Sequence, residues 1–215
     1  MKVIAINGSP RKNWNTNILL EKCLEGAKGK GAEVELIHLY DIDFKGCMSC
    51  FGCKRKGIVV KKCLLKDDLE TILQKICDCD VLVLGSPIYF SSITSKMRAL
   101  WERMIFPYSS YELKPSTFGK KINTAFIYTM NALGFALPLI GYTKIFKKNA
   151  KQLKKTFGNS EYLISTSTYQ FDDYGKYAIT VFKGDKRLKR RETVFKKDCK
   201  KAFLLGERLV EGNNG

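Results

Sequence analysis

Five short runs of apolar residues alternate along this chain with segments in which apolar residues recur at helical spacing. The runs lie at residues 3–6, 33–39, 81–84, 122–130 and 162–165. The helical patterns lie at residues 17–29, from Asp67 or Asp68 through Ile76, and at 93–106, 136–156 and 190–210. Strands that alternate with helices in this way join through right-handed crossovers into a parallel sheet. We therefore expect residues 1–215 to form a single α/β domain, with a cysteine-bearing connection at 40–66 and a C-terminal helical extension at about 183–211.

The composition favours a cytoplasmic protein. The chain has 215 residues, of which 45% are hydrophobic, a size that suits one compact core. It contains no apolar run long enough to span a bilayer. The run of four apolar residues before Asn7 is too short for the core of a signal peptide. Together with eight cysteines, these features predict a reducing compartment, in which the thiols stay free or bind metal.

The formal net charge of +17 raises the hypothesis of a nucleic acid or another anionic partner. The basic residues are nevertheless dispersed, and their two denser stretches, 144–155 and 183–201, interleave with apolar residues at helical spacing. This pattern favours solvated helix faces over a nucleic-acid patch. A basic nucleic-acid-binding or regulatory domain is therefore the least favoured class, although the positive surface would help to attract an anionic nucleotide or an acidic protein.

The segment Asn7–Asn17 joins the first apolar run to the first helical pattern. A loop at a helix start offers unpaired backbone N–H groups and the positive end of the helix dipole, which together suit a phosphate. The segment lacks both the dinucleotide fingerprint G-x-G-x-x-G and the P-loop pattern G-x-x-x-x-G-K-[ST]. An ordinary polar turn with a helix cap remains the alternative. The candidate phosphate-binding residues are Ser9, Arg11, Asn15, Thr16 and Asn17.

Two motifs carry a family resemblance. Residues 8–17, GSPRKNWNTN, follow the first predicted strand, and residues 85–103, GSPIYFSSITSKMRALWER, follow the third. In this order they resemble the NADPH-dependent FMN reductase and iron–sulfur flavoprotein branch of the flavodoxin-like superfamily, and the element pattern agrees over about residues 1–165. The resemblance implies a flavodoxin-like, doubly wound sheet of five parallel strands in a three-layer α/β/α arrangement. It also implies FMN at the switch point between the first and third strands.

By the same resemblance, the first loop wraps the FMN phosphate and a second loop meets the flavin ring. A flat apolar ring needs aromatic and aliphatic walls, with backbone N–H groups aimed at its polar atoms. The candidate residues of the second loop are Pro87, Ile88, Tyr89, Phe90 and Ser91. The end of the fourth strand adds Thr129 as a further contact. A hydrophobic turn that closes the end of the sheet is the alternative for the second loop.

Trp14 departs from the family pattern. It stands where such loops commonly have a small residue, often glycine. A backbone angle open only to glycine would be costly for tryptophan. We therefore expect a local reshaping of the loop, or a place for Trp14 over the flavin edge or at a dimer contact.

The sharpest metal-like signal is the spacing Cys47-x₂-Cys50-x₂-Cys53-x₉-Cys63. Cysteines three apart in a tight loop can converge on one iron–sulfur cluster, and a distant fourth completes the set of thiolates. Zinc ranks lower because its sites more often use two separated C-x₂-C pairs. The spacing is similar to the compact motif of iron–sulfur flavoproteins, so a [4Fe–4S] cluster is one expectation. Free thiols, a redox-active disulfide and dimer packing remain alternatives. The other cysteines, expected to be buried as hydrophobic residues, are Cys23, Cys77, Cys79 and Cys199.

The leading functional hypothesis is an FMN-dependent NAD(P)H oxidoreductase that passes electrons to a quinone, a flavin, or another small-molecule or protein acceptor. Because the cofactor carries this chemistry, no side-chain acid or base is assigned. The alternative is an electron carrier with FMN and a [4Fe–4S] cluster. The resemblance also implies a homo-oligomer, a dimer or tetramer, whose partner helps to close the flavin site. The apolar face of the final predicted helix is a candidate contact for that partner.

Overall fold

The computed structural model describes residues 1–57, 62–111, 116–179 and 182–212. Its sheet is built from β1 (Lys2–Asn7), β2 (Glu33–His38), β3 (Val81–Tyr89), β4 (Ser92–Ile93), β5 (Ile122–Thr129) and β6 (Gly158–Ser165). Five strands run parallel in the order β2-β1-β3-β5-β6, which confirms the doubly wound, flavodoxin-like fold class. The sixth strand, β4, is a short antiparallel partner of β3 that the apolar runs did not predict.

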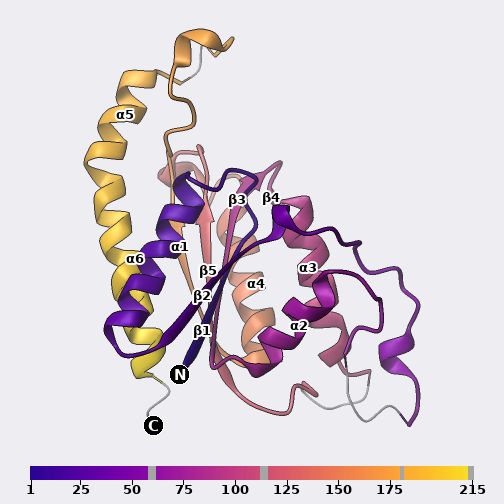
Figure 1. Cartoon of the computed structure of the whole chain (residues 1–215). Helices are drawn as coiled ribbons and strands as arrows, with labels where there is room; N and C mark the ends of the chain where they lie inside the picture. Colours follow the sequence, from indigo (N-terminus) through magenta and orange to yellow (C-terminus); the bar gives the residue numbers. More distant parts are fainter. Residues whose placement is uncertain (58–61, 112–115, 180–181, 213–215) are drawn as a thin grey trace.

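Helices cover both faces of this sheet (Figure 1). They are α1 (Asn15–Gly29), α2 (Leu69–Asp78), α3 (Ser95–Ile105), α4 (Tyr142–Phe157), α5 (Gly184–Glu192) and α6 (Val194–Glu211). The helices α1 and α6 lie on one face, and α2, α3 and α4 lie on the other. The expected α/β/α layering is therefore present.

Two helix boundaries differ from the sequence prediction. The helix expected at 136–156 begins only at Tyr142, after Pro138, whose missing N–H cannot continue a helical ladder. The helix expected at 190–210 is the second of two helices, because α5 ends just before Thr193 and α6 begins just after it. In both cases the apolar periodicity correctly predicted helix, but it did not predict the residues at which the helices begin and end.

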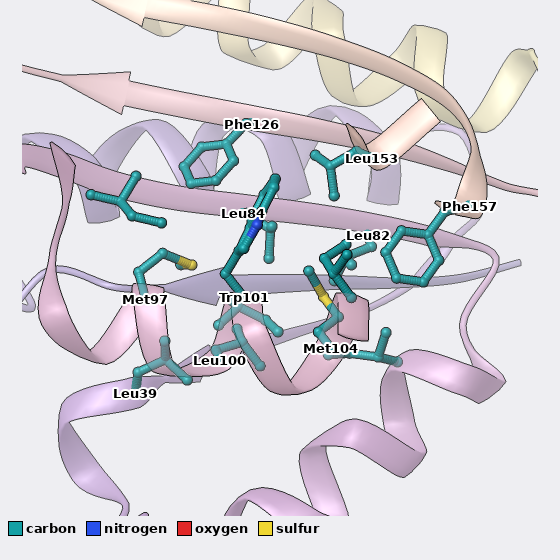
Figure 2. Close-up of a cluster of buried hydrophobic side chains, with 14 of the residues drawn as sticks. Leu39, Leu82, Leu84, Met97, Leu100, Trp101, Met104, Phe126, Leu153 and Phe157 are labelled. Carbon is teal, nitrogen blue, oxygen red and sulfur yellow. The ribbon is translucent and has the colours of Figure 1, made fainter. Parts of the chain in front are cut away.

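The larger of the two hydrophobic clusters lies between the sheet and the helices α2, α3 and α4. Figure 2 shows Met97, Trp101 and Met104 projecting from α3 toward the sheet. Leu82 and Leu84 of β3 face this side, while the alternate residues of the same strand face the other side. A strand that is apolar on both faces is typical of a parallel sheet covered by helices.

The other half of the core depends on a close crossing of α1 and α6. A Cβ atom on Gly206 would lie 1.8 Å from the carbonyl oxygen of Cys23, and one on Gly26 would lie 2.0 Å from the carbonyl oxygen of Phe203. Only glycine allows the two backbones to approach so closely. The apolar residues of α6 that are buried against α1 and the sheet are Phe195, Ala202, Leu205, Leu209 and Val210. The apolar face that was expected to meet a partner is therefore used within the chain.

Four cysteines are placed much as expected. Cys23 and Cys79 are fully buried, and Cys77 and Cys199 are partly buried. Burial raises the pKa of the Cys23 thiol to about 12, so this side chain remains neutral and packs as a small hydrophobic residue. Within the described ranges, no helix is long and apolar enough to cross a lipid bilayer.

Candidate functional site

A pocket of about 200 Å³ lies at the carboxyl ends of β1, β3 and β5. Eight of the residues that were expected to contact FMN line it: Ser9, Arg11, Asn15, Thr16, Pro87, Ile88, Tyr89 and Thr129. The lining is completed by Trp14, Met130, Asn131, Ala132, Tyr142, Thr168 and Gln170. Carboxyl ends of strands at a switch point are where doubly wound sheets bind ligands.

The two loops meet because β1 and β3 are neighbours in the sheet. Asn7 pairs with Gly85 in the strand register, and the N–H of Gly8 donates to the carbonyl oxygen of Gly85 at 2.8 Å. The hydroxyl of Thr94 donates to the carbonyl oxygen of Gly8 at 2.6 Å. A Cβ on Gly8 would lie 2.8 Å from the Cβ of Met97, so a side chain there would push the loop away from α3.

The first loop is held by its own polar side chains. The amide oxygen of Asn7 accepts from the N–H of Ser9 at 2.9 Å, and the hydroxyl oxygen of Ser9 accepts from the N–H of Arg11 at 3.1 Å. The side chain of Asn17 accepts from Asn7 at 3.2 Å and donates to Glu21 at 2.8 Å. Asn17 is therefore directed along the helix and does not line the pocket.

The start of α1 fits an anion. In the part of the chain that the structure describes, no side chain caps the first turn of this helix. Its first three residues, Asn15, Thr16 and Asn17, are all buried. The backbone N–H groups of a first turn have no partner within the helix, and when buried they need one. A phosphate at this position would supply it.

The second loop is a tight hairpin between β3 and β4. Phe90 and Ser91 form its turn with φ values of 46° and 66°, the left-handed region that this kind of turn requires and that glycine or asparagine usually fills. The hairpin turns Phe90 outward, where its side chain is fully exposed. Pro87, Ile88 and Tyr89 thus line the pocket, whereas Phe90 and Ser91, also expected there, are not part of the lining. Left-handed residues other than glycine store strain and occur often at functional sites.

The end of β5 supplies the third wall. The hydroxyls of Thr129 and Thr16 share a hydrogen bond of 2.7 Å, which ties β5 to the start of α1. The side-chain N–H of Asn131 donates to Gln170 at 2.9 Å. The amide oxygen of Asn131 is buried and has no hydrogen-bond partner among the described residues.

The segment after β6 covers the first loop. The carbonyl oxygen of Tyr169 accepts from the indole N–H of Trp14 at 2.9 Å and from the amide of Asn15 at 2.7 Å. The guanidinium of Arg191 on α5 donates to the amide oxygen of Asn15 at 2.8 Å. The guanidinium groups of Arg11 and Arg191 lie 3.9 Å and 5.2 Å from the centroid of the Trp14 ring.

This arrangement explains how the loop accommodates tryptophan at position 14. Its φ of −126° is an ordinary extended value, so tryptophan needs no glycine-only conformation here. Its ring binds the C-terminal segment and also lines the pocket. The extended conformation removes the reason for the expected reshaping.

Sequence reasoning missed the contributions of Thr168 and Gln170 to the pocket. The predicted pattern ended with the last strand, although the polar run STSTYQ at 165–170 directly follows it. Polar residues just after a parallel strand were the available signal. Among the described residues, the pocket lining includes no Asp or Glu, and Arg11 is the one charged residue in it. The pocket therefore suits an anionic ligand.

A second pocket, of about 230 Å³, brings the four motif cysteines together. It is lined by Cys47, Cys50, Cys53 and Cys63 together with Met48, Phe51, Leu64, Leu65, Glu102, Arg103, Phe106 and Pro107. Ser49 and Phe51, which lie between the cysteines, have φ values of 52° and 53° and turn the loop sharply. Among the described residues, no group of three or more His, Cys, Asp or Glu side chains is arranged to hold a metal ion.

Arg103 contacts both ends of the cysteine-bearing connection. Its side chain is buried and donates a hydrogen bond to the thiol of Cys63 at 3.3 Å. It also donates to the carbonyl oxygens of Lys45 and Leu65, at 3.0 Å each, and to the carboxylate of Asp67. Burial alone would raise the pKa of Asp67. Hydrogen bonds from Arg103 and from the N–H of Lys45 outweigh burial and hold that pKa below its usual range. Arg103 had not been singled out from the sequence, although it ends the second family motif.

Residues 1–137 match the sequence model of the family described as NADPH-dependent FMN reductase. A stretch of 103 residues is 39% identical to an iron–sulfur flavoprotein of Methanocaldococcus jannaschii and covers 48% of this chain and 51% of that protein. An iron–sulfur flavoprotein of Archaeoglobus fulgidus is 41% identical over 103 residues, which is 48% of each chain. The chain thus spans about half the length of these curated relatives.

Solved structures also resemble this fold. An NAD(P)H:quinone oxidoreductase from Methanothermobacter marburgensis has a TM-score of 0.72 with 15% sequence identity. The match covers 97% of this chain and 96% of that chain. At this identity the likeness concerns the fold, and it includes the C-terminal region that lies beyond the family match.

Proposed function

Because the chain belongs to the NADPH-dependent FMN reductase family, we propose that it is an FMN-dependent oxidoreductase that transfers electrons from NAD(P)H to a quinone, a flavin or another acceptor. The observation that carries this proposal is the pocket at the ends of β1, β3 and β5, where two family motifs meet around an uncapped, buried helix start. The described residues of the pocket lining include Arg11 and no carboxylate, which supports an anionic cofactor.

Each wall has a role in this proposal. The backbone N–H groups at the start of α1 would hold the FMN phosphate, with Ser9, Arg11, Asn15 and Thr16 around it. Asn17, which does not line the pocket, would support the loop through its hydrogen bond with Asn7. The flavin ring lies beside Pro87, Ile88, Tyr89 and Thr129, with Phe90 and Ser91 in the neighbouring hairpin turn. Asn131 would form part of the wall beside the ring. The support for these roles is the pocket lining.

Bound FMN supplies the hydride and electron chemistry. Across the whole reaction, NAD(P)H loses a hydride, and a quinone gains that hydride together with one proton from solvent. The chain itself binds and orients the ring and limits the access of water. No side-chain acid or base is assigned a step.

The absorption spectrum of anaerobically purified protein and steady-state oxidation of NADH and NADPH with an added quinone test this proposal. We expect the two near-ultraviolet and blue bands of flavin and turnover with at least one nicotinamide. Apoprotein that fails to bind added FMN would overturn the cofactor assignment. FMN-loaded protein that oxidises neither nicotinamide would remove the reductase function and leave an electron carrier.

A second candidate is an iron–sulfur flavoprotein that relays electrons through FMN and a [4Fe–4S] cluster. The observation that favours it is the shared pocket of Cys47, Cys50, Cys53 and Cys63, whose thiolates would ligate the cluster. A broad brown shoulder in the anaerobic spectrum is expected, with its loss in Cys50→Ala and its retention in the control Cys199→Ala. A spectrum with flavin bands alone after anaerobic iron and sulfide reconstitution would contradict this candidate.

We also propose that the chain is one cytoplasmic domain that assembles into a dimer or tetramer. The unpaired state of all eight cysteines supports a reducing compartment. The packing of α6 on α1 supports a single domain. Exposed apolar side chains near the pocket, Phe90, Phe135 and Leu139, support a partner at this edge. Sedimentation equilibrium would contradict the oligomer if the loaded protein had the mass of one chain.

A further inference from the structure

The helix α5 carries a buried guanidinium with no ion-pair partner. Arg187 is 7% exposed, and no carboxylate in the described ranges forms a salt bridge with it. The helix lies outside residues 1–137, the part of the chain matched to the family. A buried charge is costly unless other groups stabilise it, so the position of Arg187 calls for a functional explanation.

The contacts of Arg187 point toward the cofactor pocket. One guanidinium N–H donates to the carbonyl oxygen of Asn131 at 3.2 Å, and the group lies 4.8 Å from the ring centroid of Phe182. Asn131 is the pocket residue whose amide oxygen is buried and free. Arg187 thus contacts a pocket-lining residue but does not itself line the pocket.

The nearby charged groups do not neutralise Arg187. Burial lowers the pKa of its guanidinium, Tyr174 opposes this effect, and the charge of Arg190 adds to it. Arg190 is itself paired with the buried carboxylate of Asp198 at 2.9 Å. A hydroxyl of Ser165 also donates to that carboxylate at 2.8 Å. Asp198 is therefore occupied, and among the described residues no carboxylate pairs with Arg187.

We propose that Arg187 is a positioning residue that fixes Asn131 in the pocket wall and selectively stabilises the reduced, anionic form of the bound flavin. This inference rests on the proposed FMN function. The phosphate of FMN carries the same charge in both redox states, so its attraction to Arg187 cancels when the two states are compared. The ring gains negative charge only on reduction, and a nearby cation tunes its electronic properties. Low polarity around a buried group strengthens this interaction.

The test compares Arg187→Gln with Lys186→Gln. Both variants remove one positive charge from the same helix, but Lys186 is exposed and Arg187 is buried. The readout is the two-electron midpoint potential of bound FMN, together with the affinity of the apoprotein for oxidised FMN. For Arg187→Gln we expect the preference for reduced over oxidised FMN to fall about tenfold, which lowers the potential by about 30 mV. Lys186→Gln should retain the wild-type potential. A wild-type potential in Arg187→Gln would overturn the inference.

A second variant separates charge from packing. Arg187→His places a titratable group at the same position, which is charged at low pH and neutral at high pH. We expect its potential to approach that of the wild type near pH 5.5 and to fall below it near pH 8.5, a range that spans the usual pKa of histidine. A deficit that is constant with pH would assign Arg187 a packing role only and overturn the proposal. This variant also decides the question if Arg187→Gln does not fold.

The outcome for the wild type distinguishes this inference from the function on which it rests. If the wild type binds FMN and oxidises NAD(P)H while Arg187→Gln has an unchanged potential, the inference alone falls. If the wild type binds no FMN, the proposed function falls and the inference with it.

Discussion

Replacing Arg103 with Met removes the guanidinium that joins α3 to the cysteine-bearing connection. The methionine stem preserves most of the apolar volume, so the variant tests the polar contacts rather than a cavity. Four acceptors lose their donor: the thiol of Cys63, the carbonyl oxygens of Lys45 and Leu65, and the carboxylate of Asp67. We expect a large loss of stability that is concentrated in this connection.

The magnitude follows from the exposure of the partners. Removing one member of a buried ion pair costs about 3–5 kcal/mol, because the other charge remains buried. The Asp67 side chain is 16% exposed, and it keeps hydrogen bonds from the N–H groups of Lys45 and Leu69 at 3.2 Å each. These contacts reduce the penalty on the remaining carboxylate. We therefore expect a loss near the lower end of the range, about 3 kcal/mol.

Urea denaturation in the presence of reductant measures this change. The matched control is Arg98→Met on the same helix, where the Arg98 side chain is 57% exposed and pairs with Glu102 at 3.0 Å. An exposed pair contributes about 0–1 kcal/mol, so the control should unfold almost as the wild type does. If Arg103→Met lost less than about 1 kcal/mol and matched its control, the buried bridge argument would be wrong.

Two further predictions concern the same framework. Gly206→Ala should destabilise the protein by about 3 kcal/mol, because the added methyl meets the backbone of Cys23 and overpacking costs about 1–3 kcal/mol. A thermal melt with an unchanged midpoint would contradict the close crossing of α1 and α6. The depressed pKa of Asp67 stabilises the fold above the unfolded-state pKa of Asp and is lost as pH falls through the folded-state value. Stability should therefore decline below about pH 4, and by less in Arg103→Met; parallel pH profiles of the two proteins would contradict this assignment.

Local periodicity was sufficient for most of the fold. Alternation between short apolar runs and helical patterns predicted the parallel strands, because each pattern reflects burial of neighbouring residues. The family resemblance added the three-layer α/β/α arrangement. The pattern did not predict β4, since a strand of two residues is too short to show periodicity. It also placed the apolar face of α6 at a partner, because a sequence pattern reveals that a face is buried but not which segment covers it.

In the candidate site, too, local motifs could be predicted from the sequence, whereas contacts between distant segments could not. The polar segment Asn7–Asn17 and the loop at 87–91 could be recognised as local motifs, and eight of the residues predicted from the motifs and from Thr129 line one pocket. The outward position of Phe90 follows from the β3–β4 hairpin, which the apolar runs did not reveal. The covering contact of Tyr169 on Trp14 joins segments that are 155 residues apart.

The sequence by itself thus determined the element types, the polar character of the first loop at a helix start and the gathering of cysteines in one connection. These properties depend on residues that are close along the chain, where spacing and side-chain chemistry can be read directly. Tertiary structure alone decided that Gly8 meets Gly85, that Arg103 anchors the cysteine-bearing connection and that Arg187 lies behind Asn131. Such contacts arise from strand order and helix packing, and burial then sets the strength of their charges and hydrogen bonds.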